Sequence, residues 1–334
     1  MKSLFAANHP LLQLARSGYR LPNSYTWLAD KLYPLFALIL AIVIVLLAQF
    51  IGGVVAALSI LILVLLRGQE MPTLDTTDQV IAAITPHGAL ENALFLVCLF
   101  APIFLILAGW LRLFEKRPLW TIGLLQHNLT FNYLRGIVVG WLMFSLAVGV
   151  SAALGYLAWE HDPTQLDGLA AVTGIAMLWL GWTVQGAAEE ALTRGWLLPM
   201  ISSRYNTVMG ILLSSGLFAM LHLFNLNVSL IAILNIFLFG VFACLYVLYE
   251  GNLWGMFAIH SVWNWAQGNF YGFEVSGNPP TGVTLFNLME VGPDEITGGN
   301  FGPEGGLAVT AILLLGCAVV LMASQLRSKS VAQN

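Results

Sequence analysis

The feature that most constrains the fold is a series of long apolar runs separated by short polar connections. A helix that crosses a bilayer needs about 20 mostly apolar residues. Eight runs meet this rule: 34–66, 90–111, 133–158, 169–198, 207–223, 228–249, 253–271 and 306–326. With 58% hydrophobic and 9% charged residues, the chain has too little polar surface for a soluble globule of its size. The sequence therefore predicts an all-α, polytopic membrane protein with eight transmembrane helices in one bundle.

The chain divides into an N-terminal arm, residues 1–32, and one membrane domain, residues 33–327. The arm contains basic residues but no compact apolar stretch followed by a small-residue cleavage site, so we do not expect a signal peptide. Residues 273–305, between the last two runs, are rich in Gly, Asn and Pro, which predicts a flexible loop or a lid. No inverted repeat of the kind found in secondary transporters is visible in the sequence.

Positive charge lies on alternate connections. Twelve of the thirteen Lys and Arg residues precede the first run, lie between the second and third or at the junction of the fourth and fifth, or follow the eighth; Arg67 is the exception. Because Lys and Arg bias a connection to the cytoplasm, we expect both termini to be cytoplasmic and the membrane to be the plasma membrane. The 273–305 loop has five acidic residues and no basic one, which predicts an exterior position.

Other partners and sites are disfavoured by composition. The net charge of −4 and the scattered basic residues argue against a nucleic-acid partner. Cys98, Cys244 and Cys317 each lie alone in an apolar run, so neither a disulfide framework nor a cysteine-based zinc site is predicted.

The fourth run carries two adjacent carboxylates, Glu189 and Glu190, followed by Arg194, and Pro199 is expected to end its helix. A charged side chain at bilayer depth costs at least ~2.5 kcal/mol, so it is kept for function or for pairing. Glu190 and Arg194 are one helical turn apart and can form an ion pair. Glu189 lies about 100° around the helix and is free to meet a substrate or a water. The ion pair alone is equally consistent with packing at a helix end.

The fifth run carries Phe218 and His222, and the seventh carries His260 and Asn264, each pair four residues apart. A carboxylate and two imidazoles from three helices can activate water, with one group taking the proton and another orienting the water. The Asn264 amide can stabilise the oxyanion of a tetrahedral intermediate. Taken singly, each His or Asn is expected to satisfy a neighbouring helix, and Phe218 is expected to pack. The co-occurrence of the three motifs favours a catalytic site.

Glu-Glu-x-x-x-Arg, Phe-x-x-x-His and His-x-x-x-Asn, in this order on successive transmembrane runs, resemble the motifs of the CPBP family, which includes the CAAX prenyl endopeptidases and the bacterial Abi-type proteins. The resemblance covers residues 168–271, and all three motifs match. It implies an eight-helix intramembrane endopeptidase with a polar site in an internal cavity. Carried over, the roles are Glu189 as the base, His222 and His260 as water-positioning residues, Asn264 in the oxyanion site, and Glu190 and Arg194 as supporting residues beside Phe218.

The resemblance leaves the cofactor open. Family members are often labelled metalloproteases, and zinc held by Glu189, His222 and His260 would have the three protein ligands and open position of a catalytic site. Asn264 would then have no role as a ligand, so we assign no metal and keep zinc as the alternative. The implied partners are the lipid bilayer and a membrane-associated or lipid-modified polypeptide, prenylated or not.

Two other functions fit the same residues. Intramembrane Glu and His chains also conduct protons, so a transporter or proton relay is one alternative, and a catalytically idle immunity or binding factor is another. For the endopeptidase, we expect a cavity that faces the cytoplasm. One feature fits a shared site poorly: counted along the runs, Glu189 lies in the inner third of the fourth, whereas His222 lies near the far end of the fifth.

Overall fold

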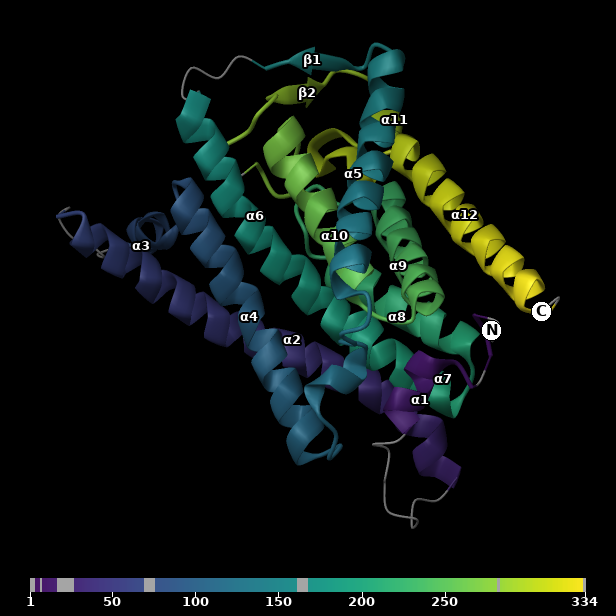
Figure 1. Cartoon of the computed structure of the whole chain (residues 1–334). Coiled ribbons are helices and arrows are strands. Elements are labelled where there is room, and N and C mark those ends of the chain that lie inside the picture. The colour runs from purple at the N-terminus through teal and green to yellow at the C-terminus, as the bar shows by residue number, and fades with distance from the viewer. Residues whose placement is uncertain are drawn as a thin grey trace.

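The computed structural model describes residues 4–6, 8–16, 27–68, 76–160, 168–280 and 283–332. The remainder of the predicted N-terminal arm, residues 1–3, 7 and 17–26, lies outside the described residues. The elements are α1 (Pro10–Arg16), α2 (Trp27–Leu66), α3 (Thr77–Ile84), α4 (Ala89–Leu113), α5 (Leu129–Ala153), β1 (Leu157–Trp159), α6 (Gly168–Glu190), α7 (Leu198–Arg204), α8 (Thr207–Leu221), α9 (Leu230–Glu250), α10 (Trp254–Trp265), β2 (Leu288–Glu290), α11 (Asp294–Thr297) and α12 (Leu307–Ala332). Figure 1 shows them as a helical bundle with the small sheet at one end and both labelled termini on one side.

Within the described residues, six helices are long and apolar enough to cross a membrane: 32–66, 89–113, 129–153, 168–204, 230–250 and 307–327. The chain therefore has the helices of an integral membrane protein, but fewer of full length than the eight predicted. The two other predicted spans form α8, with 15 residues, and α10, with 12, which a π-helical segment, Ala266–Tyr271, continues. Each residue of α10 from Gly255 to Asn264 is buried, because this helix lies among its neighbours rather than against lipid.

The third predicted helix ends earlier than its apolar run. α5 ends at Ala153, and Gly155, with a φ of 74°, reverses the chain in a conformation that favours glycine. Residues Leu157–Trp159 then form β1, which pairs antiparallel with β2. This two-stranded sheet is an exception to the all-α prediction, and it ties the α5–α6 connection to the 273–305 loop.

The prediction that Pro199 ends the fourth helix is wrong. A π-helical turn, Ala191–Leu197, follows α6, and Pro199 lies in the first turn of α7, a position that tolerates proline. The helix therefore continues to Arg204, fifteen residues past Glu189, while His222 lies fifteen residues past Thr207, where α8 begins. At ~1.5 Å per residue, both side chains are about 22 Å from the same connection, so the expected offset between them disappears.

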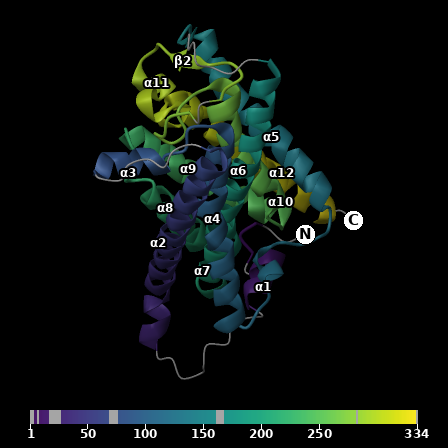
Figure 2. The same cartoon turned by 90° about the vertical axis from the view of Figure 1, so that its left-hand side faces the viewer.

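α10 lies at the centre of the bundle, between α5 and α6 (Figures 1 and 2). Two glycines bring α5 close to it: a Cβ at Gly136 would lie 2.2 Å from the Gly255 carbonyl oxygen, and one at Gly140 would lie 2.5 Å from a methyl of Val262. Small residues allow such close helix packing inside a membrane. At the end of the bundle away from the small sheet, α1 packs on α7 and buries Leu11 and Leu12 in the main core.

Candidate active site

The end of α6 buries a charged pair. Glu190 and Arg194 are both fully buried, and Arg194 Nη1 donates to Glu190 Oε1 over 2.9 Å. Arg194 also donates to the Thr193 hydroxyl, and its guanidinium carbon lies 4.4 Å from the ring centroid of Phe218. The ion pair expected from the spacing is therefore present. Phe218 does more than pack, because it also covers the buried cation with its π face.

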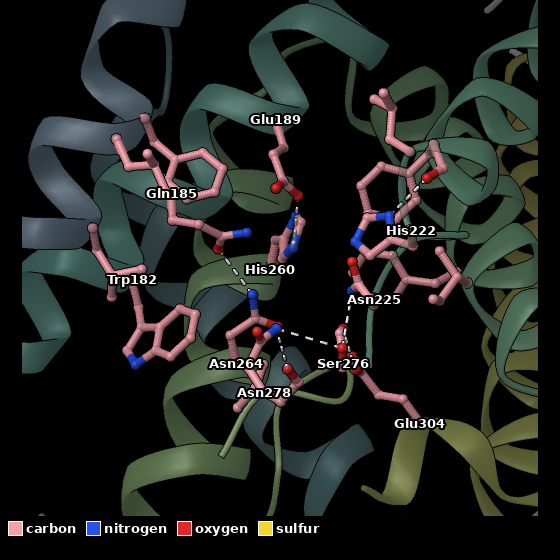
Figure 3. A pocket seen from close by; sticks show the side chains of 18 of the residues that line it. Trp182, Gln185, Glu189, His222, Asn225, His260, Asn264, Ser276, Asn278 and Glu304 are labelled. Carbon is pink, nitrogen blue, oxygen red and sulfur yellow. Dashed lines mark hydrogen bonds and ion pairs between the residues drawn. The ribbon is translucent and has the colours of Figure 1, made fainter. Parts of the chain in front are cut away.

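His260 of α10 contacts both glutamates through different ring nitrogens, and Figure 3 shows it beside Glu189. His260 Nδ1 lies 2.9 Å from Glu190 Oε1, and His260 Nε2 lies 3.7 Å from Glu189 Oε2. A carboxylate paired with Arg194 can only accept, so Nδ1 carries the proton and Nε2 keeps its lone pair toward Glu189. The contact between His260 and Glu190 was missed in the sequence, since spacing alone pairs Glu190 only with Arg194.

Glu189 faces a pocket and is less enclosed than its neighbour. Its side chain is 18% exposed, against 0% for Glu190, and its Oε2 accepts no hydrogen bond from the described residues. The separation of 3.7 Å from His260 Nε2 is too long for a direct hydrogen bond. A water that enters from the pocket can donate to the Glu189 carboxylate and to His260 Nε2, which is the arrangement needed to activate it.

Asn264 lies one turn beyond His260 on α10. Its Nδ2 donates to Gln185 Oε1 over 2.9 Å, and Gln185 lies one turn before Glu189 on α6. One Nδ2–H is used in this bond, which leaves the second for a ligand. This bond is not readable from the sequence, because it depends on how α6 faces α10.

His222 ends α8 and lies across the pocket from Glu189 in Figure 3. Its Nδ1 lies 2.7 Å from the Phe218 carbonyl oxygen. Because a carbonyl can only accept, Nδ1 carries the proton and Nε2 keeps its lone pair. Among the residues that the structure describes, no three His, Cys, Asp or Glu side chains lie close enough together to hold a metal ion. In this arrangement Glu189, His222 and His260 do not form the zinc site considered as the alternative.

The pocket has a volume of about 910 Å³ and holds Glu189, His222, His260 and Asn264 in its lining. Its walls come from α2, α4, α6, α8, α9, α10 and α12 together with the 273–305 loop. Exposed apolar side chains border it, among them Leu46 and Phe224, so it is partly open rather than enclosed.

The 273–305 loop forms one wall of the pocket through Ser276, Asn278 and Glu304. Glu304 accepts from Trp263 Nε1 over 3.0 Å and from the Ser276 hydroxyl over 2.6 Å. Asn225, just beyond α8, donates to the Ser276 carbonyl. The sequence offered no signal for this wall beyond the loop's Gly and Pro content.

Residues 171–266 match the family model described as type II CAAX prenyl endopeptidase, Rce1-like. In this segment the chain is similar to the CAAX protease family. The matched residues contain all three motifs and therefore every side chain discussed above from Gln185 to Asn264. Comparison with curated proteins and with solved structures gives no match. At the level of the family, the match supports a CAAX-protease-like membrane endopeptidase.

Proposed function

We propose that the protein is an intramembrane endopeptidase in which Glu189 activates water against a peptide bond of a membrane-associated polypeptide. The observation that carries the proposal is the placement of His260, held by Glu190 with its second nitrogen toward Glu189 at the pocket. Glu189, His260, His222 and Asn264 all line one pocket, and the family match covers all four.

In the proposed reaction a water donates one hydrogen to Glu189 and the other to the Nε2 lone pair of His260. Glu189 takes its proton, and the hydroxide attacks the carbonyl carbon of the peptide bond. The oxyanion accepts the free N–H of Asn264. When the C–N bond breaks, Glu189 returns its proton to the departing nitrogen, so a carboxylic acid and an amine are released and the carboxylate is restored.

The supporting residues act through position. Glu190 pairs with Arg194 and fixes the His260 ring by accepting from Nδ1. His222 presents its Nε2 lone pair across the pocket, where it can accept an N–H from the substrate backbone. The substrate's membrane association follows from the apolar rim, because exposed Leu46 and Phe224 border the pocket.

The test compares the membrane proteome of cells that express the wild-type chain with that of cells expressing Glu189→Gln. We expect polypeptides cleaved only with the wild-type chain, and cleavage of a purified substrate to fall by at least 10³-fold with Glu189→Gln. Glu295→Gln, an exposed carboxylate in the 273–305 loop, is the matched control and should cleave normally. Equal cleavage by Glu189→Gln and wild type would contradict the proposal.

Substitutions of Glu189 also separate the alternative functions. A proton relay would lose flux across liposomes in Glu189→Gln with no proteolytic defect, and an idle binding factor would keep its cellular effect in Glu189→Ala. Treating the purified enzyme with a zinc chelator tests the cofactor. We expect unchanged cleavage, and loss of activity that zinc restores would instead establish a metalloenzyme.

A further inference from the structure

Charge divides the molecule into two ends. Of the eight Lys and Arg side chains that the structure describes, six lie in or beside the α4–α5 and α7–α8 connections or near the end of α12: Arg112, Lys116, Arg117, Arg135, Arg204 and Arg327. We call this the basic end; in Figure 1 it lies away from the small sheet. Its two described carboxylates, Glu115 and Glu250, are each paired with an arginine.

The opposite end, called the acidic end, has the reverse composition. Eight of the twelve described Asp and Glu side chains lie there: Asp78, Glu91, Glu160, Glu274, Glu290, Asp294, Glu295 and Glu304. Arg67 is the one basic side chain described at this end, and it is paired with Glu91. Since Lys and Arg keep connections in the cytoplasm, this asymmetry assigns the basic end to the cytoplasm and the acidic end to the exterior.

The active-site pocket borders only the acidic end. Residues from three connections at this end line it: Pro86, Phe224, Asn225, Ser276, Asn278, Pro279, Pro280 and Glu304. No described residue of the basic-end connections 114–128, 205–206 or 251–253 does so. The rim is open beside the end of α8, where Leu223 is 47% exposed and Phe224 is 95% exposed.

On the cytoplasmic side of Glu189 the helix is buried by its neighbours on all faces. Every residue from Glu190 to Ser202 is buried, including the ion-paired Arg194 and the large side chain of Trp196. Trp196 donates to Glu115, and Glu115 is paired with Arg117, so the seal extends to the basic end. A polypeptide could pass this way only if the core opened, whereas the acidic end already offers a pocket.

We infer that the substrate reaches Glu189 from the exterior face or the outer leaflet, and not from the cytoplasm as the sequence led us to expect. The inference rests on the proposed endopeptidase function and narrows its substrate class. The substrate is a membrane-associated polypeptide whose cleaved segment faces the exterior. A lipid-modified tail that stays in the cytoplasm has no open path to this pocket.

Cysteine labelling in intact cells tests the inference with a matched pair of variants. Phe224→Cys places a thiol at the pocket rim, and Phe114→Cys places one at the basic end; both phenylalanines are exposed, 95% and 66%. A membrane-impermeant maleimide should label Phe224→Cys in intact cells and Phe114→Cys only after permeabilisation. Leu226→Cys, in the connection after α8, provides a second reporter, and the wild-type chain measures the background from its own cysteines.

The reverse pattern, or equal labelling of the two ends in intact cells, would overturn the inference. If neither outer cysteine reacts at all, a C-terminal alkaline phosphatase fusion decides: an inactive fusion supports the inference and an active one contradicts it. Labelling does not depend on catalysis, so it should be the same in a Glu189→Gln background. If the inferred orientation is wrong, the labelling pattern changes. If the proposed endopeptidase function is wrong, the labelling is as expected but the membrane proteomes of wild type and Glu189→Gln are the same.

Discussion

Glu189 and Glu190 are adjacent in the chain, but their surroundings differ. Glu190 is fully buried and contacts both Arg194 and His260, while Glu189 is 18% exposed and has no hydrogen-bond partner at Oε2 among the described residues. A buried carboxylate that balances an arginine contributes to stability, because its removal leaves an uncompensated charge. A carboxylate at a pocket without such a pairing fits the proposed role of Glu189 as the base.

We expect Glu190→Gln to lower both stability and activity, and Glu189→Gln to lower activity alone. Loss of the Glu190 charge leaves Arg194 in the core without its counter-ion, at a cost of about 3–5 kcal/mol, and releases the His260 ring. Thermal unfolding in detergent, with cleavage assayed on the same samples, measures both effects. Equal unfolding temperatures for the two variants would contradict this division of roles.

The spacing of single residues predicted part of this site. The four-residue interval gave the Glu190–Arg194 pair, and the three motifs gave the side chains that meet in the pocket. The bonds from His260 to Glu190 and from Asn264 to Gln185 were not predictable, because they depend on how α6 and α10 are rotated against each other. That rotation is set by packing between helices and leaves no periodic signal in either one.

At the scale of elements, Gly186 sets the distance between α6 and α10. A Cβ at this position would lie 2.9 Å from the Ser261 amide nitrogen and 3.0 Å from its hydroxyl. Gly186 is one turn before Glu190, and Ser261 follows His260, so this close approach brings the imidazole to the carboxylates.

Gly186→Ala should therefore separate the two helices and reduce cleavage by at least tenfold, with a stability loss of about 1–3 kcal/mol from overpacking. Gly216→Ala is the matched control, since a Cβ at that position on α8 meets nothing within 4 Å. We expect the control to be as active as wild type. Cleavage rates and unfolding temperatures of both variants check the prediction, which fails if Gly186→Ala retains full activity.

The small sheet gives the protein a pH-dependent element outside the membrane spans. Burial, together with the carboxylates of Glu274 and Asp294, raises the pKa of Glu290 in β2 from its ordinary value of 4.5 to about 8. The folded state then binds this proton more tightly than the unfolded chain does. Stability therefore falls as the pH rises from about 4.5 to about 8, and above that range the full cost of burying the carboxylate remains.

Glu290→Gln should remove this dependence, because the amide stays neutral. We expect the variant to unfold at a higher temperature than wild type at pH 9, by roughly 2–4 °C for each kcal/mol recovered, and at a similar temperature at pH 5. Thermal unfolding in detergent at both pH values measures the difference. The effect is excluded if the difference in unfolding temperature between the variant and the wild type is the same at pH 9 as at pH 5.

Across the whole molecule, the length of the apolar runs predicted the helical membrane architecture, and the deviations have local physical causes. Helix α10 is buried among its neighbours and continues into a π-helical segment, Ala266–Tyr271, and the fourth helix passes Pro199 after a π-helical turn. Neither feature is periodic in the sequence. The sheet between β1 and β2 escaped prediction for a related reason, since each strand has only three residues.

The 273–305 loop joins these elements into one pocket, and Glu304 is its main anchor. This carboxylate accepts from Trp263 on α10 and from Ser276 in the loop, while Asn235 of α9 donates to the Glu304 carbonyl. A loop held at both the pocket wall and the bundle acts as a fixed wall of the site. A lid that must open for each turnover would gain from weaker anchoring.

Glu304→Ala removes both side-chain bonds and should loosen the wall. We expect faster cleavage of the 273–305 loop in limited proteolysis, detected by mass spectrometry of the fragments, together with a several-fold loss of peptidase activity. Glu295→Ala, an exposed carboxylate in the same loop, should change neither measurement. The two models of the loop predict opposite changes in turnover for Glu304→Ala. Faster turnover would show that the anchor restrains a moving lid. Slower turnover supports a wall that positions the substrate.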